Sequence, residues 1–461
     1  MIFNILLAFS IHSANVLKIG EFLHINSLVR QNNRLLVSTP GGIYTYNLFD
    51  NRMERSVLTE TPVKFAVMQN LLSVFFIDVF GNLYRWTTTS EDVTFLASAG
   101  PATSLGICCD KIYVENNGEI IAFTTSGFRL GNRKPESGTV WVGRLNSLTR
   151  DSLKVAFLAP FFFYDPLAGK VNFTYFYRDF NTLWVGTDKK GIYRYDFNLK
   201  IVRDSIQIGL PFSEVNCITG ISGKIFIAGN GGIALKNGRF WSFIRTDCPD
   251  VEMISPLDSS LYFSSRCGIF VLKNRWIRKF LDNGKLLGVF DGLLFVQMSG
   301  RLLEVTPAGN VLSRLKIPLE ISKMVIYEDS PLFLMDGKIY SRELQPQRKY
   351  NKFAPIYSAA VSGGRLYVLS DIGILEFKNG IVDKLPVPFK PSRGFDYPMV
   401  VADDKIFIGA PDGLYILNLK DLGFERYTPG FSLPVIKSLY FDGRNLYAGT
   451  KRGVIIFSFL Q

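Results

Sequence analysis

Imidazole side chains are the usual source of acid–base and metal chemistry, and this chain has only two histidines, His12 and His24. Ser-His-Asp triads, Cys-His pairs and most zinc sites need imidazole as a base or a ligand. The shortage therefore argues against those classes of site. We expect His24 to be a packed or surface side chain, and we predict no metal site, no cofactor and no catalytic residue.

Carboxylates remain as candidate catalysts, because glycosidases and lyases work with them, or with Tyr and Arg. The candidates Asp188, Asp371, Asp412 and Asp442 occupy recurrent turn positions in the sequence. An aspartate in a turn usually accepts hydrogen bonds from its own backbone, which favours a structural role. We therefore favour a non-catalytic protein, with a polysaccharide lyase- or hydrolase-type enzyme as the alternative.

Cationic residues give a better binding candidate. The net charge is +12, but Lys and Arg are spread along the whole chain. This spacing is typical of a solvated surface and makes nucleic acid an unlikely partner. Two pairs, Lys189-Lys190 and Lys451-Arg452, stand at equivalent hairpin positions. They are the candidate residues of a rim site for an anionic ligand such as an acidic glycan, and the alternative is that they are ordinary solvated turn residues.

The five cysteines show no spacing typical of metal ligands. Cys108 and Cys109 are adjacent and are predicted to point to opposite faces of a strand. We favour the interpretation in which all five, Cys217 included, are small buried apolar side chains. One disulfide, with Cys248 and Cys267 as the candidate pair, is the alternative in an oxidising compartment.

These residues lie within a repeated strand–turn–strand pattern, which determines the fold that positions them. Residues 181–196 consist of an apolar strand, a polar turn, a glycine and a second apolar strand, and residues 34–46, 404–417 and 444–457 repeat this pattern. The turn glycines are mostly 32 to 41 residues apart, with one interval of 73, and they are Gly42, Gly81, Gly118, Gly191, Gly232, Gly268, Gly300, Gly337, Gly373, Gly413 and Gly453. A hairpin needs a residue of positive φ, which glycine adopts at little cost.

Apolar segments before and after each hairpin complete a four-stranded antiparallel sheet with two apolar faces. Such sheets must stack, and radial stacking makes a β-propeller. We predict an all-β fold of about 11–12 four-stranded blades, in two propellers at 15–209 and 210–461. An even division, one ring inserted into another, and one large ring are open alternatives. The long interval contains an insertion at 129–138 and a degraded copy near 140–143 and 154–157.

The chain ends carry two further predictions. Residues 1–14 form a short apolar segment ending in small residues, which is typical of a signal peptide and indicates export. Residues 16–23 are expected to be an outermost strand that pairs with the last blade and closes the second propeller. No later segment is long and apolar enough to span a bilayer.

Leu183-Trp184-Val185-Gly186-Thr187 followed by Gly191-Ile192-Tyr193-Arg194-Tyr195-Asp196 resembles the two-component regulator propeller repeat. Residues 446–450 and 453–455 are similar, with Tyr in place of Trp. The resemblance extends from residue 34 to the end of the chain. It implies an extracytoplasmic propeller of the kind found in sensors that bind carbohydrate fragments. Because no membrane span or kinase follows the last blade, a free-standing binding module is the expectation.

The predicted function is therefore that of a non-catalytic, secreted or periplasmic β-propeller that binds a protein or a glycan. The alternatives are the lyase- or hydrolase-type enzyme and a structural subunit of a larger extracytoplasmic assembly.

Overall fold

The computed structural model describes residues 15–143 and 172–458, apart from positions 21, 23, 51, 90, 91, 189, 197, 200, 207–209, 211, 213, 238, 239, 245, 247, 249, 274, 275, 403 and 428–434. Residues 1–14, the predicted signal peptide, lie outside this set. The described chain is almost entirely β-strand, with one short helix, α3 (Arg348–Asn351). In this part of the chain, no helix has the length and apolar character needed to cross a membrane.

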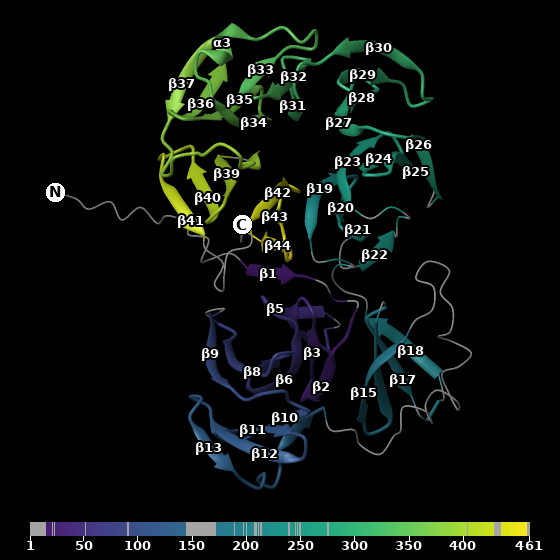
Figure 1. Cartoon of the computed structure of the whole chain (residues 1–461), viewed down its shortest axis with the longest axis vertical. Coiled ribbons are helices and arrows are strands. Elements are labelled where there is room, and N and C mark those ends of the chain that lie inside the picture. The colour runs from purple at the N-terminus through teal and green to yellow at the C-terminus, as the bar shows by residue number, and fades with distance from the viewer. Residues whose placement is uncertain are drawn as a thin grey trace, which may run out of the picture.

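Four antiparallel sheets form the N-terminal unit, coloured purple to teal in the lower half of Figure 1. In chain order their strands are β2 (Ser27–Gln31), β3 (Arg34–Thr39), β4 (Gly42–Asn47), β5 (Arg52–Leu58); β6 (Val63–Asn70), β7 (Ser73–Asp78), β8 (Asn82–Thr87), β9 (Asp92–Ser98); β10 (Ser104–Cys108), β11 (Lys111–Asn116), β12 (Glu119–Thr124), β13 (Arg129–Asn132) with β14 (Val140–Val142); and β15 (Phe173–Asp179), β16 (Thr182–Thr187), β17 (Ile192–Asp196), β18 (Ile201–Ile206).

Seven further sheets form the C-terminal unit in the upper half of Figure 1. Their strands are β19 (Val215–Ile221), β20 (Lys224–Gly229), β21 (Gly232–Asn237), β22 (Phe240–Ile244); β23 (Val251–Leu257), β24 (Ser260–Ser265), β25 (Gly268–Lys273), β26 (Trp276–Leu281); β27 (Lys285–Phe290), β28 (Leu293–Met298), β29 (Arg301–Val305), β30 (Val311–Lys316); β31 (Ile321–Tyr327), β32 (Ser330–Met335), β33 (Lys338–Tyr340); β34 (Ile356–Ser362), β35 (Arg365–Ser370), β36 (Gly373–Lys378), β37 (Ile381–Leu385); β38 (Met399–Ala402), β39 (Lys405–Ala410), β40 (Gly413–Asn418), β41 (Phe424–Tyr427); and β42 (Ile436–Phe441), β43 (Asn445–Thr450), β44 (Gly453–Ser458) with β1 (Asn15–Ile19).

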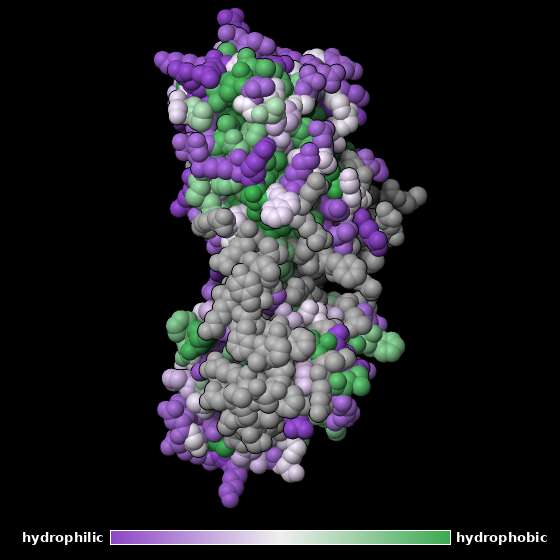
Figure 2. Space-filling model, turned by 90° about the vertical axis from the view of Figure 1, so that its right-hand side faces the viewer, coloured by the Kyte–Doolittle hydropathy of each residue, from purple (hydrophilic) through white to green (hydrophobic). Residues whose placement is uncertain are grey.

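The seven C-terminal sheets close into a ring, because each innermost strand packs against the next. β19 contacts β23, contacts continue through β27, β31, β34 and β38 to β42, and β42 contacts β19 again. The innermost strands gather around one axis, and the outer strands lie at the perimeter (Figure 1). Hydrophilic residues cover much of the outer surface of this ring when it is seen from the side (Figure 2). The prediction of an all-β propeller is confirmed.

The N-terminal sheets are arranged around a second centre. β15 packs against β2, β2 against β6, and β6 against β10. β14 hydrogen-bonds to the inner edge of β10 and contacts β2 and β6, so it lies among the innermost strands. The described sheets therefore form two separate stacked sets, and the division into two propellers at 15–209 and 210–461 stays a prediction.

The last blade receives its outermost strand from the N-terminus. β1 pairs antiparallel with β44, with Asn15 opposite Ser458 and Ile19 opposite Val454. The N-terminal unit is therefore inserted between the outermost strand of one blade and the innermost strand of the next, β19. The predicted boundary between residues 209 and 210 falls between β18 and β19 and stays a prediction.

Gly453 shows why the repeated glycine is needed at this position. Its φ is 121°, and a Cβ built on it would lie 2.1 Å from the carbonyl oxygen of Ile19 on the adjoining β1. Gly42 has a φ of 145° and the same problem with Val57 on β5. The glycine thus permits both the turn conformation and the close approach of the fourth strand.

The two units are joined where their outermost strands β1 and β5 lie side by side. The backbone N–H of Lys18 donates to the Ser56 hydroxyl over 3.1 Å, and that hydroxyl donates to the Lys18 carbonyl. An ion pair of 3.2 Å connects Arg452 of the last blade to Glu60 of the N-terminal unit. A Cβ on Gly20 would lie 3.0 Å from the Arg452 carbonyl, which leaves little space at the junction.

The long glycine interval differs from its prediction. Arg129–Asn132, placed in an insertion at 129–138, forms β13 and pairs with β12 as the fourth strand of its blade. Val140–Val142, taken as part of a degraded copy, is β14 and forms a fifth strand on the same sheet rather than a separate blade. Residues 154–157 lie outside the described residues.

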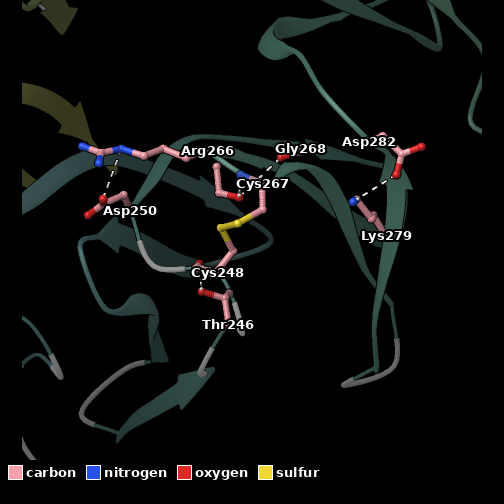
Figure 3. The surroundings of a disulfide bond; sticks show 9 residues. Thr246, Cys248, Asp250, Arg266, Cys267, Gly268, Lys279 and Asp282 are labelled. Carbon is pink, nitrogen blue, oxygen red and sulfur yellow. Dashed lines mark hydrogen bonds and ion pairs between the residues drawn. A yellow bond between two sulfur atoms is a disulfide. The ribbon is translucent and has the colours of Figure 1, made fainter.

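A disulfide joins Cys248 and Cys267, whose Cα atoms are 6.0 Å apart (Figure 3). Cys248 lies in the connection from β22 to β23, and Cys267 lies in the β24–β25 hairpin. An ion pair between Arg266 and Asp250 of 3.3 Å connects the same two segments. The disulfide that the sequence left open as an alternative is present, and the favoured interpretation, in which all five cysteines are buried apolar side chains, is wrong.

The pairing of β1 with the last blade predicts a large effect of an Ile19→Ala substitution on stability. Ile19 is buried against Leu210, Val454 and Ile456. Truncating a buried Ile leaves a cavity, so we expect a loss of about 2–5 kcal/mol, measured as a lower urea midpoint. Ile372→Ala is the matched control, because Ile372 is 47% exposed and its truncation should change stability little. Equal effects of the two substitutions would contradict the pairing.

The disulfide predicts a reductant-sensitive stability. Cys248 and Cys267 are 19 residues apart in the sequence. A loop of this size corresponds to about 3 kcal/mol of stabilisation of the folded chain. Dithiothreitol should therefore lower the urea midpoint of the natural protein and leave that of the Cys248→Ala/Cys267→Ala variant unchanged. A natural protein that is insensitive to reductant would show that the bond does not form.

Candidate functional site

The candidate site lies on the leading face of the seven-bladed ring, which we define as the face where each innermost strand begins. In an antiparallel blade the hairpin between the second and third strands lies at this same end. The leading face therefore carries the starts of β19, β23, β27, β31, β34, β38 and β42 and the hairpins that include Asp371, Asp412 and Lys451.

Polar side chains connect neighbouring blades on this face. Lys437 at the start of β42 forms an ion pair with Glu214 just before β19, and its amine also lies 3.4 Å from the Asn216 side-chain oxygen. Lys285 at the start of β27 pairs with Glu320 over 2.7 Å. These two lysines are neutralised by carboxylates of adjacent blades, so they hold the ring together and are weak candidates for ligand binding.

Lys323 differs from those lysines. It lies on β31, it is half-buried, and its amine donates to the Ser358 hydroxyl on β34 over 3.2 Å. Within the described part of the chain, Lys323 forms no ion pair. Burial lowers the pKa of Lys323 to about 8, although the Asp396 carboxylate raises it in part. Lys323 is thus a partly desolvated cation close to the ring axis that lacks a contacting carboxylate.

An aromatic cluster lies next to Lys323, between the blade of β34 and the blade of β38. The connection of residues 386–398 contributes Phe389, Phe395 and Tyr397. Tyr397 is buried, Phe389 stacks on it at 5.7 Å between ring centroids, and Phe395 meets it edge-on at 5.0 Å. Tyr357, which directly precedes Ser358, contacts Tyr397 edge-on at 5.9 Å. Phe389, Phe395 and Tyr357 keep part of their surface exposed.

Carboxylates orient two tyrosines of this region. The Tyr357 hydroxyl donates to Asp371 over 2.5 Å, and the Tyr415 hydroxyl donates to Asp412 over 2.8 Å. Burial, assisted by the hydrogen bond to Asp371, raises the pKa of Tyr357 to about 12. The Tyr357 phenol therefore stays protonated at neutral pH and acts as a hydrogen-bond donor.

Three of the four predicted rim cations lie among the described residues, and each has different surroundings. Lys189 lies outside the described residues. The Lys190 N–H donates to the Thr187 hydroxyl over 2.9 Å, and burial lowers the pKa of the Lys190 amine. Lys451 is exposed on the leading face, whereas Arg452 pairs with Glu60 across the junction of the two units. Their role in binding stays a prediction.

The aspartates that were set aside as turn residues behave in two ways. Asp442 accepts the backbone N–H groups of Arg444 and Asn445, and Asp188 accepts the backbone N–H of Asn172. These bonds are those of turn and loop carboxylates. Asp371 and Asp412 accept tyrosine hydroxyls in hairpins on the leading face, so they belong to the candidate site. Asp442 also accepts a hydroxyl, that of Tyr447 over 3.0 Å, but it lies in the β42–β43 turn on the opposite face.

Sequence reasoning missed Lys323, Tyr357 and the 386–398 connection. One signal was available, because the stretch between Leu385 and Met399 is long for a propeller connection and contains two Phe and a Tyr. The position of Lys323 beside Ser358 had no such signal, since the two residues come from different blades.

Comparison with known proteins adds fold-level similarities. No protein-family model matches the chain, and no curated protein matches it. Similar solved structures include the extracellular domain of BT4673 from B. thetaiotaomicron, assigned to a one component system. The alignment has 14% sequence identity and a TM-score of 0.44, and it covers 94% of this chain and 75% of that chain. PorZ, a surface component of the type-IX secretion system of Porphyromonas gingivalis, has 14% identity, coverages of 94% and 74%, and a TM-score of 0.44.

The WD40 β-propeller domain of Doa1 is also similar, with 13% sequence identity and a TM-score of 0.44. That alignment covers 54% of this chain and 94% of the Doa1 domain. Similarities at this level assign neither a ligand nor an activity to the chain. Membership of the two-component regulator propeller family, expected from the repeat, stays a prediction, and the propeller fold rests on the sheets described above.

The lowered pKa of Lys323 predicts a specific pH dependence of stability. The unfolded chain keeps this lysine protonated up to about pH 10.4, whereas the folded chain releases the proton near pH 8. Stability should therefore rise as the pH increases from about 8 to 10, because the unfolded state binds more protons in that window. Lys323→Met should lack this rise and be more stable at pH 7 by on the order of 2 kcal/mol, after allowance for partial exposure.

Urea midpoints measured across that pH range test this prediction. Lys224→Met is the matched control, because Lys224 is an exposed lysine that begins β20 on the opposite face of the ring. The control should follow the natural protein. Parallel profiles of the natural protein and Lys323→Met would show that Lys323 is ordinarily hydrated.

Proposed function

We propose that this chain is a non-catalytic, extracytoplasmic binding module whose leading face binds an acidic glycan. The observation that carries the proposal is the half-buried, unneutralised Lys323 beside the partly exposed aromatic cluster of Tyr357, Phe389 and Phe395. A carboxylate, phosphate or sulfate group would form a charge-assisted hydrogen bond with the Lys323 amine. An adjoining sugar ring would pack on the aromatic surface.

The site has the mixed character expected of a ligand-binding surface. Apolar and aromatic side chains supply contact area, and a few placed polar groups fix orientation. The Tyr357 hydroxyl and the Asp371 carboxylate stand in a 2.5 Å hydrogen bond at the edge of the cluster and can exchange it for sugar hydroxyls. The exposed amine of Lys451 on the same face would add positive potential. Lys189, Lys190 and Arg452 remain proposed contributors to the rim.

The proposed location is supported by cysteine chemistry. Disulfides persist in secreted and periplasmic proteins and are rare in the cytosol. The Cys248–Cys267 bond of this chain is therefore compatible with the export expected from residues 1–14. A secreted or periplasmic module would meet glycans directly.

One specific observation favours the alternative that the chain is an enzyme. A lysine with a pKa of about 8 can act as a general base near neutral pH, and Lys323 has such a value. Its neighbour Ser358 and the protonated Tyr357 would then be the other groups close to a substrate. We favour binding, because the Asp412 carboxylate is held both by the Tyr415 hydroxyl and by a 2.7 Å ion pair with Arg426, which disfavours a role as catalytic acid or base.

The test is a glycan array that pairs uronic-acid, phosphate- and sulfate-bearing glycans with neutral glycans of the same backbone, followed by calorimetry with the best acidic glycan. Binding should prefer the acidic members. Lys323→Met should weaken it by about 10- to 100-fold, the value of a hydrogen bond to a charged group, while Lys224→Met should have no effect. Shortened reaction products that depend on Lys323 would favour the enzyme. Absence of binding, or binding that Lys323→Met leaves unchanged, would overturn this site.

A further inference from the structure

A second group of reactive side chains lies in the N-terminal unit, far in sequence from the leading face of the ring. Cys108 ends β10, and Cys109 follows it in the turn to β11. The two sulfur atoms are 3.5 Å apart. The prediction that these adjacent cysteines point to opposite faces is wrong, because Cys109 has a φ of 54° and has left the extended conformation on which strand alternation depends.

A carboxylate from a distant segment completes the group. Glu136 precedes β14, and its carbonyl oxygen accepts the hydroxyl and the N–H of Thr139, at 2.6 and 3.3 Å. Its carboxylate forms an ion pair with Lys111 at the start of β11. The two sulfur atoms and a Glu136 carboxylate oxygen all lie within 4.8 Å of one another. β14 pairs with β10, so the fold itself brings Glu136 beside the cysteines.

We propose that Cys108, Cys109 and Glu136 form a binding site for a zinc-like, soft divalent metal ion. Thiolates favour such ions, and a carboxylate is an accepted third ligand. Two sulfurs bound to one tetrahedral zinc at about 2.3 Å are roughly 3.8 Å apart, close to the separation of these two atoms. Three protein ligands leave the fourth position open to water or to an exogenous ligand.

The site is accessible and has an anchored backbone. Cys109 is exposed, Cys108 is half-exposed, and the Glu136 side chain is 39% exposed. The Gln69 side chain donates to the Cys109 carbonyl over 2.6 Å, which holds the turn in place. A metal ion can thus enter from solvent with small side-chain movements.

A disulfide between the same cysteines is the competing outcome. Disulfides normally join residues whose Cα atoms are at least about 4.4 Å apart, whereas adjacent residues are held at about 3.8 Å. Cys248 and Cys267, at 6.0 Å, fall within the ordinary range. The backbone therefore favours bond formation at Cys248–Cys267 and retention of two thiols at Cys108–Cys109.

The experiment uses the full chain purified without reductant. Thiol titration under denaturing conditions should find Cys108, Cys109 and Cys217 reduced, and peptide mass spectrometry should assign them. The protein is then titrated with Co²⁺, with thiolate-to-cobalt absorption as the readout, and the bound Co²⁺ is displaced with Zn²⁺. We expect one equivalent to bind. A Cys108–Cys109 disulfide in the native protein, or no thiolate-to-cobalt band, would overturn the proposal.

Substitutions distinguish the residues that bind the metal ion from neighbouring residues that do not. Cys109→Ser should abolish the absorption band, and Glu136→Gln should weaken Zn²⁺ binding by about tenfold or more. Lys111→Met should bind at least as tightly as the natural protein, because it frees the Glu136 carboxylate from its ion pair. Cys217→Ser, at a buried thiol elsewhere, is the matched control and should bind normally. Loss of binding in Lys111→Met, or normal binding in Cys109→Ser with unchanged urea midpoints, would contradict the assignment.

Discussion

The hydrogen bonds between β1 and β44 are the constraint on which the rest of the structure depends. They give the last blade its fourth strand, and they tie the first described residues of the chain to its last strand. Without β1, β44 would be the exposed edge strand of the last blade. The same pairing places β1 against β5 and so positions the N-terminal unit. The completion of the last blade, the insertion and the contact of β1 with β5 at the junction all follow from these five residues.

The closed ring brings charged side chains of neighbouring blades into contact around one axis. Lys437 and Glu214, or Lys285 and Glu320, meet because neighbouring innermost strands are held together around one axis. Each of these two lysines is neutralised by a carboxylate of a neighbouring blade. Lys323 meets a hydroxyl instead, so its burial is uncompensated by a contacting carboxylate. A buried charged group that no contacting opposite charge balances is often found at a functional site. This reasoning connects the fold to the proposed acidic ligand.

The sequence predicted the propeller because its signal is local. Turn glycines such as Gly42 and Gly453 sit between two apolar strands, and each is required by a positive φ and by a close carbonyl of the adjoining strand. The candidate site depends on contacts between blades, such as Lys323 with Ser358, which leave no periodic trace. The predicted orientation of Cys108 and Cys109 was wrong, because side chains alternate between the two faces only within a strand, and β10 ends at Cys108. Glu136 was assigned to an insertion, although β14 returns it to the β10 edge.

Amide hydrogen exchange of the intact chain is the most direct test of the pairing between β1 and β44. If β1 is the fourth strand of the last blade, the amides of residues 15–19 that bond to β44 will exchange as slowly as those of β43, which lies inside the same sheet. Removing residues 1–19 will then speed exchange along β44. Rapid exchange of residues 15–19 in the intact chain, at the rate of an exposed terminus, would contradict the account.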